Sequence, residues 1–350
     1  MRSIVKNIRA IWLTLFAGVA ILTATGCPRG GGGTTKRLDG AGSSFVDPMM
    51  QEWAGLYKKE KGVNVNYQSK GSGAGINMMT GKEVEFGCSD APLNDEQLAT
   101  CKEKNGEVLH LPLCMGAIVP AYNLEGVGDL VFDGPTFANI FLGKITKWDD
   151  PALAKLNPEA KLPDEKIAVA FRSDSSGSTY ILSDYFSTID KQAWTPGKGT
   201  AIKFPVGTGS KGTDGVAGFV KQTKGAIGYV ELIYALKNSI SYGSMVNAKG
   251  KTIKASMKSV TAAAATATIP DYLRYSIVNA PGEDAYPIAG SVWAIVYVKQ
   301  PAAKVETLRE FLTWIAHDGQ KATEKLHYAA LPEKIVKRID EKVKLLEANK

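Results

Sequence analysis

Short apolar runs alternate with helix-like runs along most of this chain, and the alternation limits the folds that it can adopt. Six runs are apolar and short enough for buried strands: 63–68, 85–88, 108–119, 167–171, 227–230 and 292–298. Between them, apolar residues recur at helical spacing in 48–58, 75–79 and 305–316. Strands that alternate with helices form sheets covered by helices. The sequence therefore predicts an α/β protein.

The start of the chain predicts export and attachment to a membrane. Basic residues precede an apolar run, 11–22, which is too short to span a bilayer and is typical of a secretory signal. Small residues before Cys27 resemble the lipobox of bacterial lipoproteins, in which the cysteine carries the lipid. The alternative is an ordinary signal cleaved nearby, with Cys27 incidental. The glycine-rich segment 28–37 is then a flexible tether, and the folded body begins near Leu38.

The length of the body predicts two lobes. Roughly 310 residues follow the tether, which is more than one hydrophobic core usually covers. Two long apolar runs, 117–122 and 291–297, are the expected crossings between the lobes, because the pattern of the sequence changes after each of them. The first lobe would then be discontinuous, with residues 38–121 and 291–350. The second lobe would hold residues 122–290.

Charge and cysteine content argue against two classes of function. The formal net charge is +7. Removing the signal takes away Arg2, Lys6 and Arg9 and leaves +4. The remaining sequence has no basic run interleaved with aromatic residues. This modest excess gives no reason to expect nucleic-acid binding. The later cysteines and the three histidines match no zinc spacing, so no metal or other cofactor is expected. Three cysteines follow Cys27, and they could be buried thiols or could include a single disulfide bridge: Cys88, Cys101 and Cys114.

The segment F-R-S-D-S-S-G-S-T, at 171–179, predicts an oxyanion site. An apolar strand delivers Arg172, Asp174 can orient the guanidinium, and the residues from Ser176 to Ser178 open a helix whose first N–H groups lack helical partners. A guanidinium beside a helix N-terminus suits phosphate-like ligands. The alternative is an ordinary serine-rich helix cap, with Arg172 paired to a surface carboxylate.

Two glycine and serine turns resemble this arrangement. G-A-G-S-S-F at 40–45 and G-S-G-A-G at 71–75 each lead into a helical run. Glycine lets the backbone approach a ligand closely, and hydroxyl and N–H groups supply donors to an anion. Each turn alone is weak evidence, because a connection between a strand and a helix needs small residues and a cap in any case.

Asp90 ends the strand-like segment F-G-C-S-D, where α/β proteins place their ligands. A carboxylate accepts hydrogen bonds and repels a fully ionised oxygen, so Asp90 suits an anion that carries a proton. Hydrogen phosphate carries such a proton at neutral pH, and sulfate does not. The alternative role for Asp90 is a cap on the next turn.

Together these segments resemble a known family from Leu38 to about Lys337. The chain is similar to the substrate-binding protein of the bacterial ABC-type phosphate importer, the PstS type. The matching stretches occur in the family's order: G-A-G-S-S-F, V-N-Y-Q-S-K-G-S-G-A-G, F-G-C-S-D-A-P-L, L-G-K-I-T-K-W-D-D-P, A-V-A-F-R-S-D-S-S-G-S-T, G-A-I-G-Y-V-E and Y-A-A-L-P.

The resemblance implies a two-lobed periplasmic-binding-protein fold of type II, with the ligand cleft between the lobes. It implies a monomeric exported receptor that binds inorganic phosphate, delivers it to an ABC permease with a cytoplasmic ATPase, and catalyses no reaction. Asp174 would orient Arg172. The implied ligand contacts are Ser44, Phe45 (through its backbone N–H), Ser72, Asp90, Arg172, Ser176, Gly177 and Ser178. Ser44 and Ser178 stand where the family often has threonine, and both keep the hydroxyl.

Two rival functions are open. The ligand could be sulfate, molybdate or another oxyanion, and Asp90 is the residue that argues for a protonated one. A phosphoester hydrolase could use Ser176 as its nucleophile, but this requires a base brought close by the fold. The G-x-G-x-x-G at 207–212 lacks the setting of a dinucleotide site and predicts a loop before a helix near 216–221. Trp148 is expected to be a packing residue.

Overall fold

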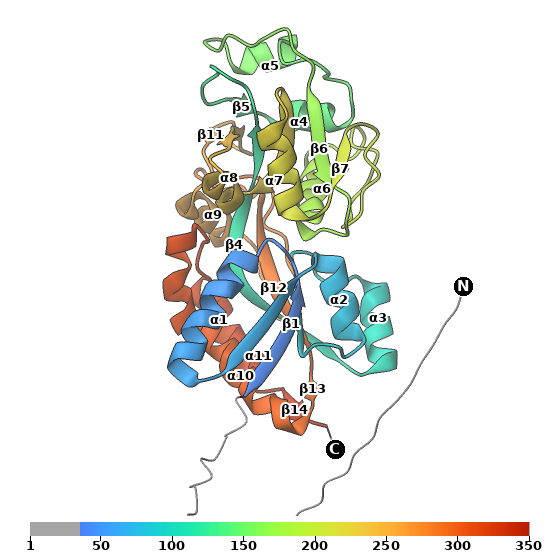
Figure 1. Ribbon diagram of the computed structural model, residues 1–350, viewed down its shortest axis with the longest axis vertical. Coiled ribbons are helices and arrows are strands. Elements are labelled where there is room, and N and C mark those ends of the chain that lie inside the picture. Colours follow the sequence, from blue (N-terminus) through green and yellow to red (C-terminus); the bar gives the residue numbers. More distant parts are fainter. Residues whose placement is uncertain (1–35, 350) are drawn as a thin grey trace, which may run out of the picture. The chain divides into compact units, whose positions relative to one another are not determined.

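The computed structural model describes residues 36–349. The predicted signal, the Cys27 lipidation site and all but the end of the tether lie outside the described residues. Within them the chain forms two α/β lobes connected by strand β4 (Val108–Tyr122), as Figure 1 shows. The predicted fold class is confirmed, whereas the residue limits proposed for the lobes remain predictions. No helix in the described part is both long and apolar enough to cross a membrane.

The first lobe is built on five strands in the order β2-β1-β3-β12-β4. β1 runs parallel to β2 and β3, and β12 runs antiparallel to β3 and β4. The strands are β1 (Arg37–Gly42), β2 (Asn64–Ser69), β3 (Phe86–Ser89) and β12 (Ala289–Tyr297), with a short pair formed by β13 (Lys299–Gln300) and β14 (Glu347–Ala348). The helices are α1 (Asp47–Lys61), α2 (Ser72–Thr80), α3 (Asp95–Lys104), α10 (Ala302–Ala316) and α11 (Glu333–Val343), with the short turns η1 (Asp318–Ala322) and η2 (Glu324–Leu326).

The second lobe continues the sheet in the order β4-β8-β6-β7, and β9 also pairs with β4. These strands are β6 (Ala168–Arg172), β7 (Thr208–Ser210), β8 (Ala226–Glu231) and β9 (Ser241–Tyr242), and a small sheet holds β5 (Val131–Phe132), β10 (Ser244–Val246) and β11 (Thr252–Ile253). The helices are α4 (Gly134–Phe141), α5 (Pro151–Leu156), α6 (Gly177–Ile189), α7 (Gly212–Gln222), α8 (Leu232–Lys237) and α9 (Met257–Ala265).

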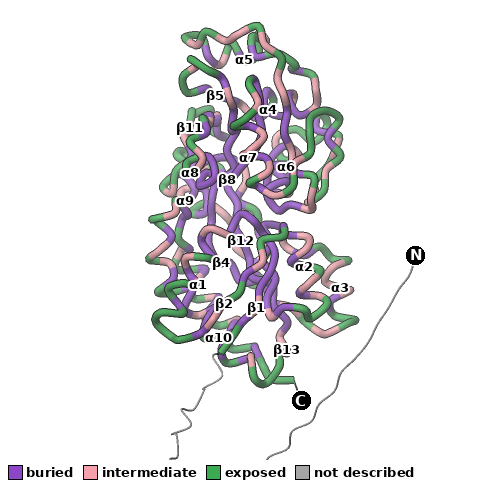
Figure 2. The backbone as a smooth tube through the Cα atoms, viewed as in Figure 1, coloured by how far each residue is buried: buried purple, intermediate pink, exposed green. Residues whose placement is uncertain are grey.

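Strand β4 is long because it serves both lobes. Its first part pairs with β12 and its last five residues, 118–122, pair with β8. Every residue of β12 and all but the first of β4 are buried, as the continuous purple along these strands in Figure 2 shows. The register between β4 and β12 shifts next to Pro112, which has no N–H to donate. Strands buried on both faces read as continuous apolar runs, which is why the sequence predicted this one.

Strand β1 is absent from the sequence prediction, although it lies between β2 and β3. Its sequence, R-L-D-G-A-G, lacks the β-branched and aromatic residues that are common in strands. The glycines are there because the sheet needs space: a Cβ on Gly40 would lie 2.1 Å from the Phe86 ring. Gly42 has a φ of 138° and would place a Cβ 2.1 Å from the Cys88 carbonyl oxygen. Glycine in β1 therefore marks a close approach between this strand and its neighbour β3.

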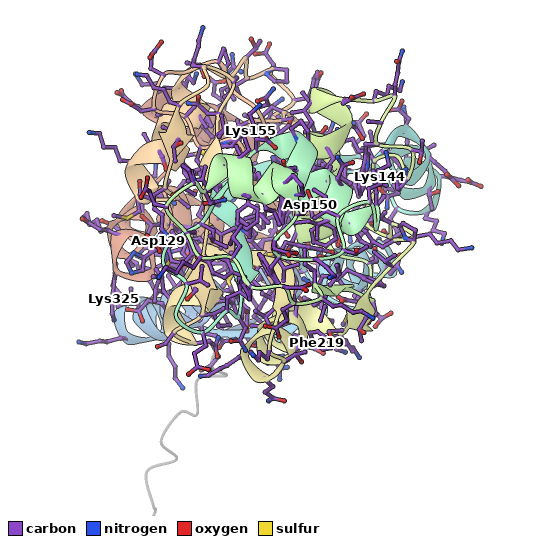
Figure 3. The ribbon with its side chains drawn as sticks, turned by 90° about the horizontal axis from the view of Figure 1, so that it is seen from above. Asp129, Lys144, Asp150, Lys155, Phe219 and Lys325 are labelled. Atoms are coloured by element: carbon purple, nitrogen blue, oxygen red, sulfur yellow. The ribbon has the colours of Figure 1, made fainter. Side chains whose placement is uncertain are left out.

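Several smaller predictions can be compared with the structure. Trp148 is fully buried and its Nε1 donates to the Gly225 carbonyl at 2.9 Å, so its packing role is confirmed. The glycine segment 207–212 contains the short strand β7 and leads into α7. In Figure 3 three labelled charged residues of the second lobe lie on its surface, and all three are exposed: Asp129, Lys144 and Lys155.

Candidate functional site

The ends of three strands and the starts of two helices meet at one buried site between the lobes. Residues 43–45 follow β1, Asp90 follows β3 and Arg172 ends β6. Ser72 is the first residue of α2, and Ser176 is the N-cap of α6. The structure brings all nine predicted residues to this region. Asp174 is half-buried and the other eight are buried: Ser44, Phe45, Ser72, Asp90, Arg172, Ser176, Gly177 and Ser178.

Arg172 is held in one orientation by its partners. Its Nε and Nη2 donate to the two oxygens of Asp174 at 2.8 and 2.6 Å, and Nη1 donates to Thr213 Oγ1 at 3.1 Å. Partial burial raises the pKa of Asp174, but the hydrogen bonds and charge of Arg172 outweigh it and hold that pKa below its ordinary value. Arg172 is the one buried lysine or arginine of residues 36–349. The ion pair between Arg172 and Asp174 is therefore not a surface ion pair, which was the alternative interpretation of this motif.

Ser72 connects the two lobes. Its Oγ accepts from the backbone N–H of Asp90 at 3.3 Å and from the backbone N–H of Gly177 at 3.1 Å. A second bond between the lobes runs from the N–H of Gly73 to the carbonyl of Ser175, at 3.1 Å. The first residues of α2 and α6 thus lie against each other.

Ser176 caps its own helix. The Oγ of Ser176 accepts from the N–H of Thr179 at 3.2 Å, which is the cap. The backbone N–H of Ser176 donates to the Thr200 carbonyl at 2.7 Å. Two of the three histidines, which a serine nucleophile could use as a base, are paired elsewhere. His110 Nε2 accepts from the Leu93 N–H at 3.0 Å, and His317 lies 2.8 Å from Asp340. Within residues 36–349 the Ser176 hydroxyl is hydrogen-bonded to a backbone N–H and not to a histidine or a carboxylate.

Asp90 lies within a small network of hydroxyl and N–H groups. The hydroxyl of Ser43 donates to Asp90 Oδ1, and Ser43 Oγ accepts from the Phe45 N–H at 3.0 Å. Burial raises the pKa of Asp90 to about 8, and the nearby Glu231 adds to the shift, while the Ser43 hydroxyl and Arg172 oppose it. This carboxyl therefore binds or releases a proton near neutral pH.

The sequence prediction missed three residues of the site. Ser43 precedes the predicted Ser44, and only its contact with Asp90 distinguishes it. Thr213 lies just after the glycine segment 207–212, and its Oγ1 is 2.9 Å from Ser44 Oγ. Glu231 is 1% exposed and accepts a hydrogen bond from the Ser178 hydroxyl. Glu231 lies in the motif G-A-I-G-Y-V-E, but no anion-binding pattern of hydroxyl residues adjoins it in the sequence.

The site has the chemistry of an oxyanion site and not of a metal site. It combines hydroxyl and N–H donors, one guanidinium and buried carboxyl acceptors, which together suit an oxyanion that carries at least one proton. No group of three or more histidine, cysteine or acidic residues that could hold a metal ion occurs within residues 36–349. In the same part of the chain, Cys88, Cys101 and Cys114 are free and buried.

Comparison with known proteins shows which family the chain belongs to. Residues 28–318 match the family model described as PBP superfamily domain. The chain is 40% identical over 312 residues to a phosphate-binding protein PstS of Xylella fastidiosa, which covers 87% of this chain and 84% of that protein. It is 38% identical over 310 residues to a phosphate-binding protein PstS of Haemophilus influenzae, which covers 86% of this chain and 91% of that protein.

Solved structures agree with the fold. A periplasmic phosphate-binding protein, PfluDING, solved with phosphate, superposes with a TM-score of 0.73 at 18% identity and covers 87% of this chain and 93% of that chain. A phosphate-binding protein from Stenotrophomonas maltophilia gives a TM-score of 0.67, also at 18% identity and with the same coverage. The two-lobed periplasmic-binding-protein fold is therefore confirmed.

Proposed function

Because the chain belongs to the PstS family of phosphate-binding proteins, we propose that it binds inorganic phosphate and delivers it to an ABC-type import permease. The observation that carries this proposal is the burial, in one site, of a single guanidinium together with the carboxyl of Asp90. Arg172 supplies positive charge for the anion, and Asp90 supplies an acceptor for its proton. A site with both favours hydrogen phosphate over sulfate.

The predicted ligand contacts are part of the proposal. Ser72 and Ser176 use their oxygens to accept N–H groups of the protein, so each hydroxyl hydrogen is available to a phosphate oxygen. The hydroxyls of Ser44 and Ser178 and the N–H groups of Phe45 and Gly177 complete the set. In this structure these two N–H groups donate to Ser43 and Ser72. Asp174 keeps the Arg172 guanidinium in place through two hydrogen bonds. Phosphate binding would exchange bonds such as that between Ser44 and Thr213 for bonds to the ligand.

The cellular setting is proposed from the start of the chain. The basic residues, the apolar run and Cys27 support an exported lipoprotein, held at the membrane by its lipid and by the tether 28–37. A receptor of this kind works as a monomer and catalyses no reaction.

Titration calorimetry with phosphate, arsenate and sulfate tests the function. Phosphate and arsenate should bind, since both carry a proton at neutral pH, and sulfate should not. Tight binding of sulfate with no response to phosphate would contradict the proposal. Turnover of a chromogenic phosphate ester, abolished by Ser176→Ala, would instead favour a hydrolase.

A further inference from the structure

Glu231 is a buried carboxyl that the proposed ligand contacts leave without a role. It is the last residue of β8, where it pairs with Ile118 of β4, and it is 1% exposed. One carboxyl oxygen, Oε1, accepts from the hydroxyl of Ser178 on α6. The other, Oε2, is buried and has no hydrogen-bond partner among residues 36–349. Burying a carboxyl oxygen without a hydrogen-bond partner costs free energy, so Glu231 calls for an explanation.

Ser178 differs from the other hydroxyls of the site in the direction of its hydrogen bond. Ser72 and Ser176 accept hydrogen bonds from backbone N–H groups, which leaves their hydrogens for a ligand. Ser178 instead donates its hydrogen to Glu231 Oε1. A hydroxyl has one hydrogen and two lone pairs, so Ser178 can present only acceptor capacity to a ligand.

Four titratable groups from other elements face Glu231. Arg172 faces it from β6, Asp90 from the loop after β3, Tyr234 from α8 and Tyr328 from the loop after η2. The guanidinium of Arg172 is already bonded to both oxygens of Asp174. Burial raises the pKa of Glu231, while Arg172 and the Ser178 hydroxyl oppose that shift. Ser178 donates to Oε1 when Glu231 is ionised, and also when Glu231 carries its proton on Oε2, the oxygen without a partner.

We propose that Glu231 is a positioning residue of the anion site: by accepting the Ser178 hydrogen it makes Ser178 an acceptor toward the ligand. This inference rests on the proposed phosphate binding. Asp90 and Ser178 then offer two acceptors, which match the two P–O–H groups of dihydrogen phosphate. Monohydrogen phosphate has one such group, so an unprotonated oxygen would face one of the acceptors. Glu231 therefore biases the site toward the more protonated form of its ligand.

The test compares phosphate affinities measured by titration calorimetry at about pH 6 and about pH 8.5, for the parent and its variants. Glu231→Leu frees the Ser178 hydrogen to donate to the ligand. The ratio of the affinity at the higher pH to that at the lower pH should then rise about fivefold, the factor of a hydrogen bond of ordinary strength. Ser178→Ala removes the acceptor and should raise the same ratio. Glu52→Leu, on α1 and paired with Lys325, is the control and should leave the ratio unchanged.

The double variant separates positioning from charge. If Glu231 acts through Ser178, adding Glu231→Leu to Ser178→Ala should change the ratio no further. A Glu231→Leu effect that persists in full without Ser178 would overturn the proposal, because Glu231 would then act by its charge. An unchanged ratio in Ser178→Ala would also overturn it, even if Glu231→Leu fails to fold. A parent that binds no phosphate at either pH would instead refute the proposed function itself.

Discussion

Asp90 of the first lobe lies directly against Gly177 of the second. A Cβ added to Gly177 would stand 2.3 Å from Asp90 Oδ2 and 2.5 Å from its Cβ and Cγ. The N–H of the same glycine donates to Ser72 Oγ at 3.1 Å. Glycine at this position thus lets the start of α6 approach the end of β3 closely enough for both lobes to contact one small ligand.

We expect Gly177→Ala to hold the lobes apart. The added methyl group needs space that Asp90 occupies, so phosphate affinity should fall at least about tenfold, which corresponds to roughly 1.4 kcal/mol. Gly218→Ala is the matched control, because a Cβ at Gly218 in α7 meets no atom within 4 Å. The control should bind phosphate normally and gain up to about 1 kcal/mol of stability from the better helix former. Calorimetric affinities within twofold of the parent for Gly177→Ala would contradict this expectation.

Arg172→Ala should weaken phosphate binding at least about tenfold, because a charge-assisted hydrogen bond contributes roughly 1.5 to 3 kcal/mol. Arg172→Lys should recover little of the loss. A lysine is a point charge that cannot reproduce the bonds from Nε and Nη2 to Asp174 together with that from Nη1 to Thr213. Lys147→Ala removes an exposed cation paired with Asp164 and serves as the control. Unchanged calorimetric affinity in Arg172→Ala would remove this residue from the site.

The direction of each pKa shift predicts how stability changes with pH. Folding raises the pKa of Asp90 to about 8, from about 3.9 in an unfolded chain. The buried acid is best tolerated below the lower value, and stability is lost as the pH rises toward the higher one. Asparagine cannot ionise, so the melting temperature of Asp90→Asn, relative to the parent, should increase between about pH 5 and about pH 8.

Asp174 provides a control, because folding lowers its pKa whereas folding raises the pKa of Asp90. Arg172 lowers its pKa, so its stabilising contribution is present above the pKa of the unfolded chain and is lost as the pH falls through the folded value. Asp174→Asn should therefore reduce the melting temperature at neutral pH and have less effect in acid. Both series require phosphate-free buffer, since a bound ligand stabilises the folded state. A difference for Asp90→Asn that does not vary with pH would contradict the assigned shift.

Local chemistry made part of this site predictable. Arg172, Asp174 and the start of α6 lie within a few residues of one another, and the structure joins them as the motif suggested. Long-range packing hid the rest. The glycines of β1 are explained by the Phe86 ring and the Cys88 backbone, which lie more than forty residues along the chain. Thr213 and Glu231 reach the site from α7 and β8, and a sequence without an alignment carries no mark of that proximity.

Replacing Cys27 by serine should release the protein from membranes and leave phosphate binding unchanged. The expectation rests on the basic start, the apolar run and the small residues before Cys27. Fractionation of cells that produce the parent and Cys27→Ser measures the first effect, and calorimetry measures the second. Intact-mass analysis of the parent should show a lipid on Cys27. An unmodified mature chain that starts at another residue would contradict the anchor.

Asp90 also sets the expected selectivity against sulfate. In its ionised form, which is populated as the pH rises through about 8, Asp90 accepts the proton of hydrogen phosphate. Sulfate places an unprotonated oxygen against the same carboxylate, in a site shielded from water. A site built around a hydrogen bond can reject an analogue that lacks it by about 10⁴ or more. Asp90→Asn adds a donor, so sulfate should compete far better with labelled phosphate in the variant than in the parent. Arsenate should compete in both, since it carries a similar proton. If the variant rejects sulfate as strongly as the parent does, the discrimination must come from a residue other than Asp90.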